Sequence, residues 1–417
     1  MHPNALLDLA TELLREVLRF EQPADAVVSA FFRRQRALGA RERHTLAETA
    51  YTVLRRRLLL QHLAQGGSGA LERRLAILGW QGGDTFLRGA LGPHEQQWLA
   101  QVRAIDTAAL PEKLRHNLPD WLAGTLQSEL GAEFWPLVEA LDQPAPLDLR
   151  VNTLKAKRED VQRALAEAGI EARPTPFSPW GLRVDGKPAI NRLDVFTQGW
   201  VEVQDEGSQL LALLTDAKRG EMVVDFCAGA GGKTLALGAA MRNTGRLYAF
   251  DVSGHRLDAL KPRLARSGLS NVYPAQIAHE RDERVKRLAG KIDRVLIDAP
   301  CSGLGTLRRN PDLKWRQSPK ALHELQAKQQ AILASAARLV KPGGRVVYAT
   351  CSLLTAENEA VVEGFVANAS GEFAVVPVAE ALKTERAAEL TAGDTLRLWP
   401  HRHGSDGFFA VVLQRRG

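Results

Sequence analysis

The chain has 417 residues, of which 45% are hydrophobic and 25% charged, as is typical of a soluble globular protein that buries its own core. Three cysteines without a CxxC pair exclude a disulfide framework and a zinc site, so we expect a reduced, cytoplasmic protein with no bound metal. The formal net charge of +7 suits a polyanionic partner such as nucleic acid, and no segment is apolar over a length that spans a bilayer.

The first part of the chain, residues 1–140, predicts helices only. Leucines follow helical spacing over 5–20, and a second apolar face begins at Val27. Residues 41–64 have the pattern of one long helix that ends before a run of glycines. The region is also rich in arginine, at Arg33, Arg34, Arg36, Arg41, Arg43, Arg55, Arg56 and Arg57. These side chains could form a phosphate-binding face or a solvated helical surface, and the cluster alone favours neither.

A proline-rich stretch at 143–146 marks the end of the helical part. The pattern that follows predicts a strand, a helix and two short strands, at 147–152, 159–168, 181–184 and 200–203. We therefore expect a small α+β domain over residues 145–215.

From about residue 216 the pattern changes to alternating strands and helices, which predicts an α/β domain with a parallel, doubly wound sheet over 216–417. Its clearest strands are predicted at 222–227, 246–250, 292–297 and 345–349. A helical pattern over 321–340 separates the last two. In such a sheet, ligands bind beyond the carboxyl ends of the strands, and each chemical motif of this domain follows a strand.

The first of these strands leads into a glycine-rich loop, DFCAGAGGKT, at residues 225–234. Its glycines allow a tight turn and a close approach by a ligand, and Asp251, at the end of the next strand, is placed to bind ribose hydroxyls. Cys227 stands where a phosphate-binding P-loop needs glycine, and Thr234 where a dinucleotide fingerprint needs one. The loop therefore predicts a nucleoside-type cofactor without a required pyrophosphate, and S-adenosylmethionine fits.

Two cysteines follow two other strands. Cys301 lies in DAPCSGLG (298–305), close after Asp298, and Cys351 lies in a Thr-Cys-Ser sequence. A lone cysteine is usually a small buried hydrophobic residue, but two at the ligand edge of one sheet favour chemistry. Cytosine methylation uses such groups, because a thiolate that adds to carbon 6 makes carbon 5 nucleophilic. A carboxyl group at N3 would stabilise the charge that develops on the ring.

These motifs resemble those of the Sun-type (NOL/NOP/Sun) RNA cytosine-5 methyltransferase family. The similarity extends to three further segments, LRVNTLK at 149–155, VQDEGS at 203–208 and PHRHGSDGFF at 400–409. The resemblance implies a Rossmann-like S-adenosylmethionine-dependent methyltransferase domain over 216–417 and an RRM-like domain over 145–215. The helical part, 1–140, resembles the NusB-like RNA-binding domain of the family's bacterial small-subunit ribosomal RNA member.

Carried over to this chain, the resemblance implies a role for each motif residue. Cys351 would be the nucleophile that adds to carbon 6, Cys301 would assist release of the methylated product, and Asp298 would contact the cytosine ring and the cofactor. Asp251 would bind the ribose. The remaining cofactor contacts would come from Cys227, Ala228, Gly229, Ala230, Gly231, Gly232 and Lys233.

The sequence departs from the family's pattern where adenine would be bound. The family usually has an aspartate after the third strand, but residues 271–279 contain no acid. Glu280 and Asp282 are the alternatives, and the sequence does not choose between them.

The resemblance implies that the substrate is RNA, in particular small-subunit ribosomal RNA, with no membrane partner, and we expect a monomer. Two alternatives stay open. A DNA cytosine-5 methyltransferase would carry its nucleophile in the Pro-Cys sequence, and the Thr-Cys-Ser sequence argues against it. A non-catalytic RNA-binding or assembly factor could keep the fold, but the intact Asp298, Cys301 and Cys351 argue against that.

Overall fold

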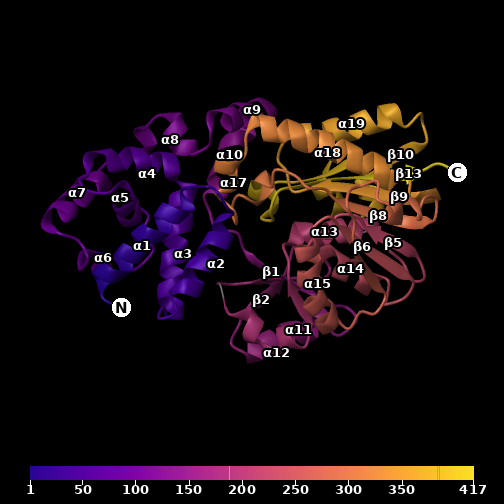
Figure 1. Cartoon of the computed structure of the whole chain (residues 1–417), viewed down its shortest axis with the longest axis horizontal. Helices are drawn as coiled ribbons and strands as arrows, with labels where there is room; N and C mark the ends of the chain where they lie inside the picture. Colours follow the sequence, from indigo (N-terminus) through magenta and orange to yellow (C-terminus); the bar gives the residue numbers. More distant parts are fainter. Residues whose placement is uncertain (187, 383, 385) are drawn as a thin grey trace. The chain divides into compact units, whose positions relative to one another are not determined.

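The computed structural model of the chain divides into two compact units (Figure 1). They comprise Met1–Pro144 with Leu307–Pro319, and Ala145–Thr306 with Lys320–Gly417. The residues that the structure describes are 1–186, 188–382, 384 and 386–417. Within these ranges, no helix combines the length and the apolar character that crossing a membrane requires.

The first unit is built from helices. Its α-helices in the N-terminal segment are α1 (Pro3–Val17), α2 (Ala24–Arg34), α3 (Ala40–Arg55), α4 (Arg57–Leu63), α5 (Leu71–Leu78), α6 (Asp84–Arg88), α7 (Pro93–Arg103), α8 (Glu112–His116), α9 (Asp120–Leu130) and α10 (Phe134–Leu141). The apolar faces of α1 to α7 meet in one core around Leu7, Phe31 and Leu46. Amphipathic spacing therefore located these helices because their apolar stripes are buried together.

The single helix expected over 41–64 is in fact two, α3 and α4. The chain turns at Arg56, whose backbone leaves the helical region (φ −110°, ψ 31°). The Arg56 guanidinium donates to both carboxylate oxygens of Asp142, with Nε at 3.0 and 2.9 Å from them. The sequence around Arg56 contains no glycine or proline that would predict this break. The contact that accompanies it, with Asp142, is distant in the sequence.

Residues 307–319 pack into the first unit, although we placed them inside the methyltransferase domain. They contain the short helix α17 (Leu313–Arg316). The Lys314 Nζ and Trp315 Nε1 atoms donate hydrogen bonds to the carbonyl oxygens of the last two residues of α3, at 2.7 and 2.8 Å. These bonds satisfy carbonyls that the end of a helix leaves without an intrahelical partner, and no local sequence pattern predicts them.

The second unit begins with a four-stranded antiparallel sheet in the order β2-β3-β1-β4. Its elements are β1 (Leu147–Val151), α11 (Arg158–Glu167), β2 (Ala172–Pro174), β3 (Gly181–Val184), α12 (Asp194–Thr197) and β4 (Val201–Val203). Strand β2 was not predicted, because three residues that end in proline are too short to show a period. The core of this sheet contains Leu149, Val161 and Leu182, all fully buried.

A nine-stranded sheet forms the rest of this unit, in the order β11-β12-β13-β9-β8-β5-β6-β7 with β10 paired to β13. The strands are β5 (Met222–Asp225), β6 (Arg246–Asp251), β7 (Val272–Gln276), β8 (Ile292–Asp298), β9 (Val340–Thr350), β10 (Phe373–Val376), β11 (Thr391–Ala392), β12 (Thr395–Leu398) and β13 (Phe408–Arg415). Strands β5 to β9 pair in parallel, as predicted. The sheet as a whole is mixed, because β10 to β13 add antiparallel pairs that the sequence analysis did not include.

Helices cover both faces of this sheet (Figure 1). One face carries α13 (Glu206–Thr215), α14 (Gly232–Ala240) and α15 (Gly254–Ser267), and the other carries α18 (Pro319–Ala337) and α19 (Glu359–Asn368). Adjacent residues of β5 therefore enter different cores, with Val223 on the first side and Val224 on the second. Strands buried on both faces are continuous apolar runs. This arrangement confirms the predicted Rossmann-like α/β fold.

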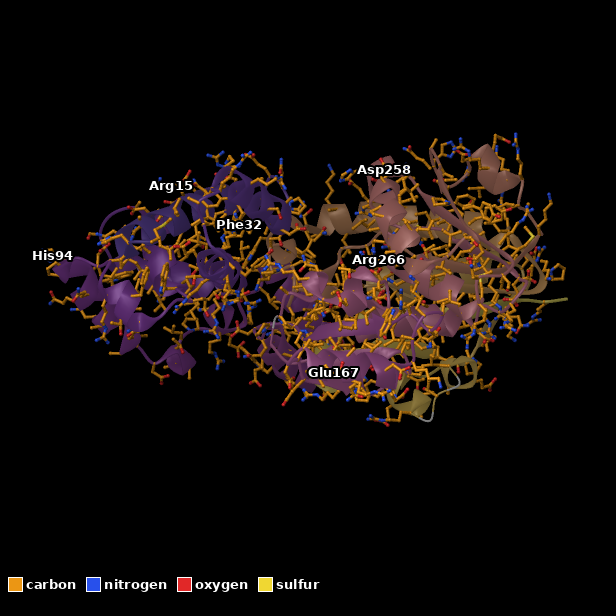
Figure 2. All side chains as sticks on the ribbon, turned by 90° about the horizontal axis from the view of Figure 1, so that it is seen from below. Arg15, Phe32, His94, Glu167, Asp258 and Arg266 are labelled. Atoms are coloured by element: carbon orange, nitrogen blue, oxygen red, sulfur yellow. The ribbon has the colours of Figure 1, made fainter. Side chains whose placement is uncertain are left out.

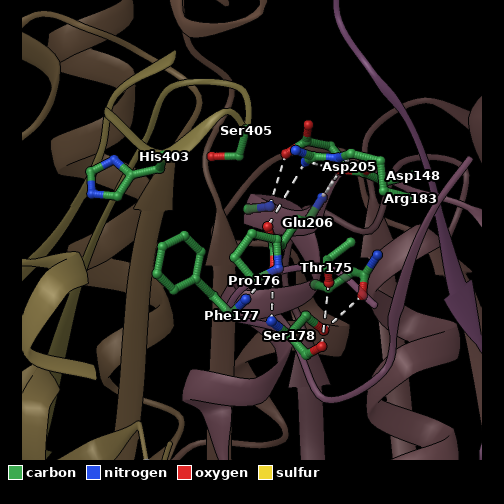
Figure 3. A network of polar contacts seen from close by, with 12 residues as sticks. Asp148, Thr175, Pro176, Phe177, Ser178, Arg183, Asp205, Glu206, His403 and Ser405 are labelled. Carbon is green, nitrogen blue, oxygen red and sulfur yellow. Dashed lines mark hydrogen bonds and ion pairs between the residues drawn. The ribbon is translucent and has the colours of Figure 1, made fainter. Parts of the chain in front are cut away.

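A buried polar network joins the small sheet to α13 (Figure 3). Arg183 of β3 donates to both carboxylate oxygens of Asp148 in β1, at 2.7 and 2.9 Å, and Asp148 accepts from the backbone N–H of Glu206 at 3.2 Å. The fully buried Glu206 carboxylate accepts from the backbone N–H groups of Phe177 and Ser178, at 2.6 and 2.7 Å. The small sheet is thus tied to the helix that precedes β5.

Candidate functional site

A cavity of about 940 Å³ lies at the carboxyl edge of the nine-stranded sheet. Asp225, Asp251 and Asp298 are the last residues of β5, β6 and β8, and all three line it. Cys301 and Cys351 line it as well. Every residue that we predicted for the site lies in its wall except Gly231, so the structure brings the predicted set together.

The glycine loop has the backbone shape that the sequence analysis expected. Gly229 and Gly231 have φ angles of +55° and +81°, in the region that favours glycine. A Cβ atom on Gly231 would also lie 2.1 Å from a methyl carbon of Leu260 in α15. Gly231 therefore acts in packing, and it is the N-cap residue of α14, whose first N–H groups have no intrahelical acceptor.

Two carboxylates lie beside this loop. Asp251 accepts one backbone hydrogen bond on each oxygen, from Gly229 at 2.8 Å and from Ser253 at 2.7 Å, which leaves further lone pairs on both oxygens. Asp225 is 1% exposed, and its Oδ2 accepts from the Thr234 hydroxyl at 2.6 Å.

Asp225 is a member of the cavity wall that our predicted site omitted. Its Oδ1 is a buried acceptor without a hydrogen-bond partner among the described residues. Burial raises the pKa of Asp225 to about 7 because it disfavours the charged form. The signal for its place in the cavity wall was its position as the first residue of the glycine motif, directly at the end of a strand.

An ion pair connects the glycine loop to the next motif. Lys233 Nζ, from the first turn of α14, lies 2.7 Å from Asp298 Oδ2 at the end of β8. Burial lowers the pKa of Lys233, but the neighbouring Asp298 carboxylate outweighs it, and the net shift is upward. Lys233 therefore stays charged at neutral pH, and it places a proton donor in the wall of the cavity that the two cysteines also line.

The two cysteines are brought together from neighbouring strands. The Sγ atoms of Cys301 and Cys351 lie 3.2 Å apart. The backbone N–H of Gly305 donates to the Cys351 carbonyl at 2.8 Å, and a Cβ on Gly305 would lie 2.1 Å from the Gly407 carbonyl oxygen. A glycine at position 305 is thus required for the close approach of its loop to the backbone of Cys351 and Gly407.

The environment of Cys301 determines the protonation state of its thiol. The hydrogen bond with Cys351, followed by burial, raises the pKa of Cys301 well above its ordinary value. Cys301 therefore remains a protonated thiol that can donate a hydrogen bond to the sulfur of Cys351.

Glu280 and Asp282, the two alternatives for the adenine contact, lie in the loop after β7 and differ in their position relative to the cavity. Glu280 lines the cavity, and Asp282 is not part of its wall. Asp282 instead accepts from the backbone N–H groups of Ala278 and Arg284, at 3.0 and 2.9 Å, and caps the short helix α16 (Glu283–Lys286).

Other polar residues of the cavity wall were not predicted from the sequence. They include Gln204, Ser208, Arg263 and Lys328. Gln204 belongs to a segment that the family resemblance had marked. Arg263 and Lys328 lie in α15 and α18, where an amphipathic helix pattern contains charged residues in any case and gives no signal of a site.

Most of the chain is similar to known rRNA methyltransferases. The family model described as 16S rRNA methyltransferase RsmB/F matches residues 212–414, and the RsmF/B-like ferredoxin-like domain matches 118–191. A Synechocystis protein named probable ribosomal RNA small subunit methyltransferase B is 36% identical over 341 residues, which cover 81% of this chain and 75% of that protein. This chain belongs to the RsmB/F family of rRNA methyltransferases.

Two further comparisons agree with this RsmB/F membership. A Bacillus subtilis protein with the same name is 30% identical over 343 residues, covering 82% of this chain and 76% of that protein. The crystal structure of PH0851 superposes with a TM-score of 0.81 at 27% identity, over 100% of this chain and 99% of that one. The predicted Sun-type family is thereby confirmed, and the chain is an rRNA methyltransferase.

Two sets of arginines can be distinguished in the first unit of this RsmB/F protein. Arg33, Arg36 and Arg41 are exposed around the turn from α2 to α3, and we call them the exposed arginine set. Arg15, labelled in Figure 2, is exposed on the same unit. Neighbouring Arg34 is engaged in an ion pair with Glu16 at 2.5 Å.

Arg55 and Arg57 form the second set, the packed arginine pair. An Arg55 Nη atom donates to the carbonyl of Arg308 at 3.0 Å. The Arg57 guanidinium lies over the rings of Phe20 and Trp315, at 4.8 and 5.2 Å from their centroids. These two side chains hold the first unit together, so only part of the cluster matches the phosphate-binding interpretation.

Proposed function

We propose that this protein transfers a methyl group from S-adenosylmethionine to carbon 5 of a cytosine in small-subunit ribosomal RNA, through a covalent bond between Cys351 and carbon 6. The observation that carries the proposal is the pair of thiols 3.2 Å apart beside the Lys233–Asp298 ion pair, in the wall of one cavity. Family membership favours RNA over the DNA alternative.

The polar groups of the cavity fit the proposed cofactor. The free lone pairs of Asp251 can accept from ribose hydroxyls, and the unpartnered Oδ1 of Asp225 can accept from the methionine ammonium group. The N–H groups at the start of α14 suit a carboxylate, and Glu280 can accept from the adenine amino group. When bound, S-adenosylmethionine supplies an electrophilic methyl group on its sulfonium.

In the proposed reaction, Cys351 attacks carbon 6 of the base as a thiolate, which makes carbon 5 nucleophilic. The addition leaves negative charge on the pyrimidine ring, part of it at N3. The Lys233 ammonium group, whose Nζ lies 2.7 Å from Asp298 Oδ2, is available to stabilise that charge by donating a hydrogen bond.

Release of the product requires that carbon 5 lose its proton, which passes to solvent water. The electrons of that bond rebuild the carbon 5–carbon 6 double bond, and the bond from carbon 6 to Cys351 breaks. Cys301 is held protonated and within 3.2 Å of Cys351, so it can donate a hydrogen bond to the departing sulfur. This step gives the second cysteine a role that only begins after methyl transfer.

The target cytosine should be unpaired or flipped out of a helix, because a stacked base hides carbon 6 from a thiolate. RNA binding would be shared by the exposed arginine set and the small sheet of 145–215. A cytoplasmic location and a monomeric state remain predictions of the sequence analysis.

The experiment that tests this proposal is methyl transfer from labelled S-adenosylmethionine to small-subunit ribosomal RNA taken from cells that lack the protein. After digestion to nucleosides, the label should be found in 5-methylcytidine, and a Cys351→Ala preparation should give none. Label in another nucleoside, or transfer to DNA instead of RNA, would contradict the proposal.

A further inference from the structure

Each of the two cysteines is followed directly by a serine that the proposed reaction does not use. Ser302 and Ser352 are both 1% exposed, and their hydroxyl oxygens lie 3.3 Å apart. The two serine hydroxyls thus lie close together in the same way as the thiols of Cys301 and Cys351, one residue further along each loop.

One carboxylate joins the two serines. Glu357, which is 0% exposed, accepts from the backbone N–H of Ser302 at 2.8 Å and from the Ser302 hydroxyl at 2.5 Å. Its Oε2 also accepts from the hydroxyl of Ser352. Gln329 of α18 donates to Glu357 Oε1 and to the carbonyl of Pro300, both at 3.0 Å. A single buried acid therefore bonds to the loops of both cysteines.

The turn that carries Glu357 is itself fixed. Tyr348 donates its hydroxyl to the Glu357 carbonyl at 2.7 Å. The next residue, Asn358, accepts from the Thr350 hydroxyl at 2.5 Å and donates to the Ser352 carbonyl at 3.1 Å. The carboxylate is thus held on a rigid support by groups on both sides of Cys351.

The sheet does not set the separation of the thiols. Parallel pairing of β8 with β9 ends at Asp298 and Ala349, and a last backbone bond runs from Ala299 N–H to the Ala349 carbonyl at 2.8 Å. Beyond this point the two chain segments leave the ladder. Their further approach depends on the Gly305 bond to Cys351 and on the bonds to Glu357.

We infer that Glu357 is a positioning residue that holds the thiols of Cys301 and Cys351 at reacting distance by binding both loops at once. The catalytic meaning of this inference rests on the proposed function, but the juxtaposition of the thiols can be measured without it. Removing the carboxylate leaves one buried N–H and two buried hydroxyls without this acceptor. These groups can regain hydrogen bonds only if the two loops move apart or admit water.

The measurement is the effective concentration of the two thiols for each other. In glutathione redox buffers, the dithiol is oxidised to a disulfide while one glutathione disulfide is reduced to two glutathiones, and the equilibrium reports how well the thiols are held together. The full chain is used, with wild-type protein, Glu357→Ala, Glu357→Gln and Ser352→Ala. We expect Glu357→Ala to lower the effective concentration by about tenfold or more, since several buried groups lose an acceptor.

Glu357→Gln should retain most of the wild-type effective concentration. Its amide oxygen can still accept from the Ser302 N–H, and its amide nitrogen can donate to hydroxyls that rotate to accept. Ser352→Ala removes one of the two hydroxyl bonds to Glu357, together with the bond that the Ser352 hydroxyl accepts from the Leu354 N–H at 3.1 Å and its contact with the Ser302 hydroxyl. It leaves both Ser302 bonds to Glu357 in place, so it should give an intermediate value, and it remains informative if Glu357→Ala does not fold.

The matched control is Glu206→Ala. Glu206 is equally buried in the same unit and binds two backbone N–H groups, but it lies in the network of Figure 3 and bonds to neither cysteine loop. It should lower the melting temperature without changing the effective concentration of the thiols. The inference would be overturned if Glu206→Ala and Glu357→Ala lowered the effective concentration of the thiols equally. It would also be overturned if folded Glu357→Ala and Ser352→Ala did not lower it at all.

A second measurement connects the positioning role to the reaction. In Glu357→Ala, kcat for RNA methylation should fall by about tenfold or more, in step with the effective concentration. The calorimetric affinity for S-adenosylmethionine should stay at the wild-type value, and Glu357→Gln should rescue kcat. If wild-type protein does not methylate RNA while Glu357 still controls the thiols, the proposed function fails and the positioning role stands.

Discussion

Charged side chains serve different purposes in the two units. At the carboxyl edge of the nine-stranded sheet, Asp225, Lys233 and Asp298 are wholly or partly buried around a cavity, and one carboxylate oxygen there has no partner among the described residues. In the first unit, the packed arginine pair binds a carbonyl and aromatic rings, and the exposed arginine set faces solvent. Buried charge that faces a cavity indicates chemistry, whereas exposed charge indicates electrostatic attraction at most.

The largest effect that this contrast predicts is at the sheet edge. Cys351→Ala should reduce the rate of RNA methylation by at least about a thousandfold, because removing a nucleophile removes the covalent route altogether. Calorimetric binding of S-adenosylmethionine serves as the control and should be retained. A variant that methylates within tenfold of the wild-type rate would place the nucleophile elsewhere.

Asp251→Ala should weaken binding of S-adenosylmethionine by roughly 1–3 kcal/mol, because ribose hydroxyls lose a buried acceptor. Titration calorimetry measures this directly. An unchanged affinity would remove the ribose assignment, since the carboxylate would then serve only Gly229 and Ser253.

Asp225 should make cofactor binding depend on pH. Its pKa is raised to about 7 in the free protein, so the carboxyl group is protonated below that pH and must ionise to accept from an ammonium group. Affinity for S-adenosylmethionine should therefore rise as pH increases through about 7 and then level off, with proton release on binding at lower pH. Asp225→Asn should bind more weakly and flatten this profile, and an identical profile in both proteins would exclude the ammonium contact.

The smallest effects are expected in the first unit. Replacing the exposed arginine set, Arg33, Arg36 and Arg41, with alanine should lower RNA affinity several-fold. The slope of log affinity against log salt should fall by about two to three, because each arginine bound to a phosphate contributes about one to that slope. The melting temperature should not change.

Arg57→Ala is the comparison for the exposed set. It should lower the melting temperature, because the Arg57 guanidinium packs over the rings of Phe20 and Trp315, and it should leave the salt dependence of RNA binding as it is in the wild type. If Arg57→Ala lowered the salt dependence of RNA binding, and replacing the exposed arginine set lowered only the melting temperature, the roles given to the two sets would be wrong.

The sequence predicted that the motif residues lie together at the sheet edge, because its motifs follow strand ends and parallel strands bring their carboxyl ends to one edge. Gly229, Asp251 and Cys351 follow or end three different strands and line one cavity. The break at Arg56 and the packing of residues 307–319 could not be predicted, because both accompany contacts between residues far apart in the chain.

The positioning role of Glu357 was also beyond reach of the sequence. Glu357 lies six residues after Cys351 and fifty-six after Cys301, and an acid in a turn is ordinarily solvated. Only the fold shows that this one is buried against both serines. Spacing identifies groups that strand ends align, but not groups that tertiary packing places.

The central claim is that Cys351 attacks and Cys301 releases, and one gel tests it most directly. Protein is mixed with small-subunit ribosomal RNA and labelled S-adenosylmethionine, denatured and separated by electrophoresis. Cys301→Ala should show a stable RNA–protein adduct, because it attacks and methylates but eliminates slowly. Cys351→Ala and the double variant should show none. An adduct trapped by Cys351→Ala and absent from Cys301→Ala would reverse the two roles and contradict the mechanism.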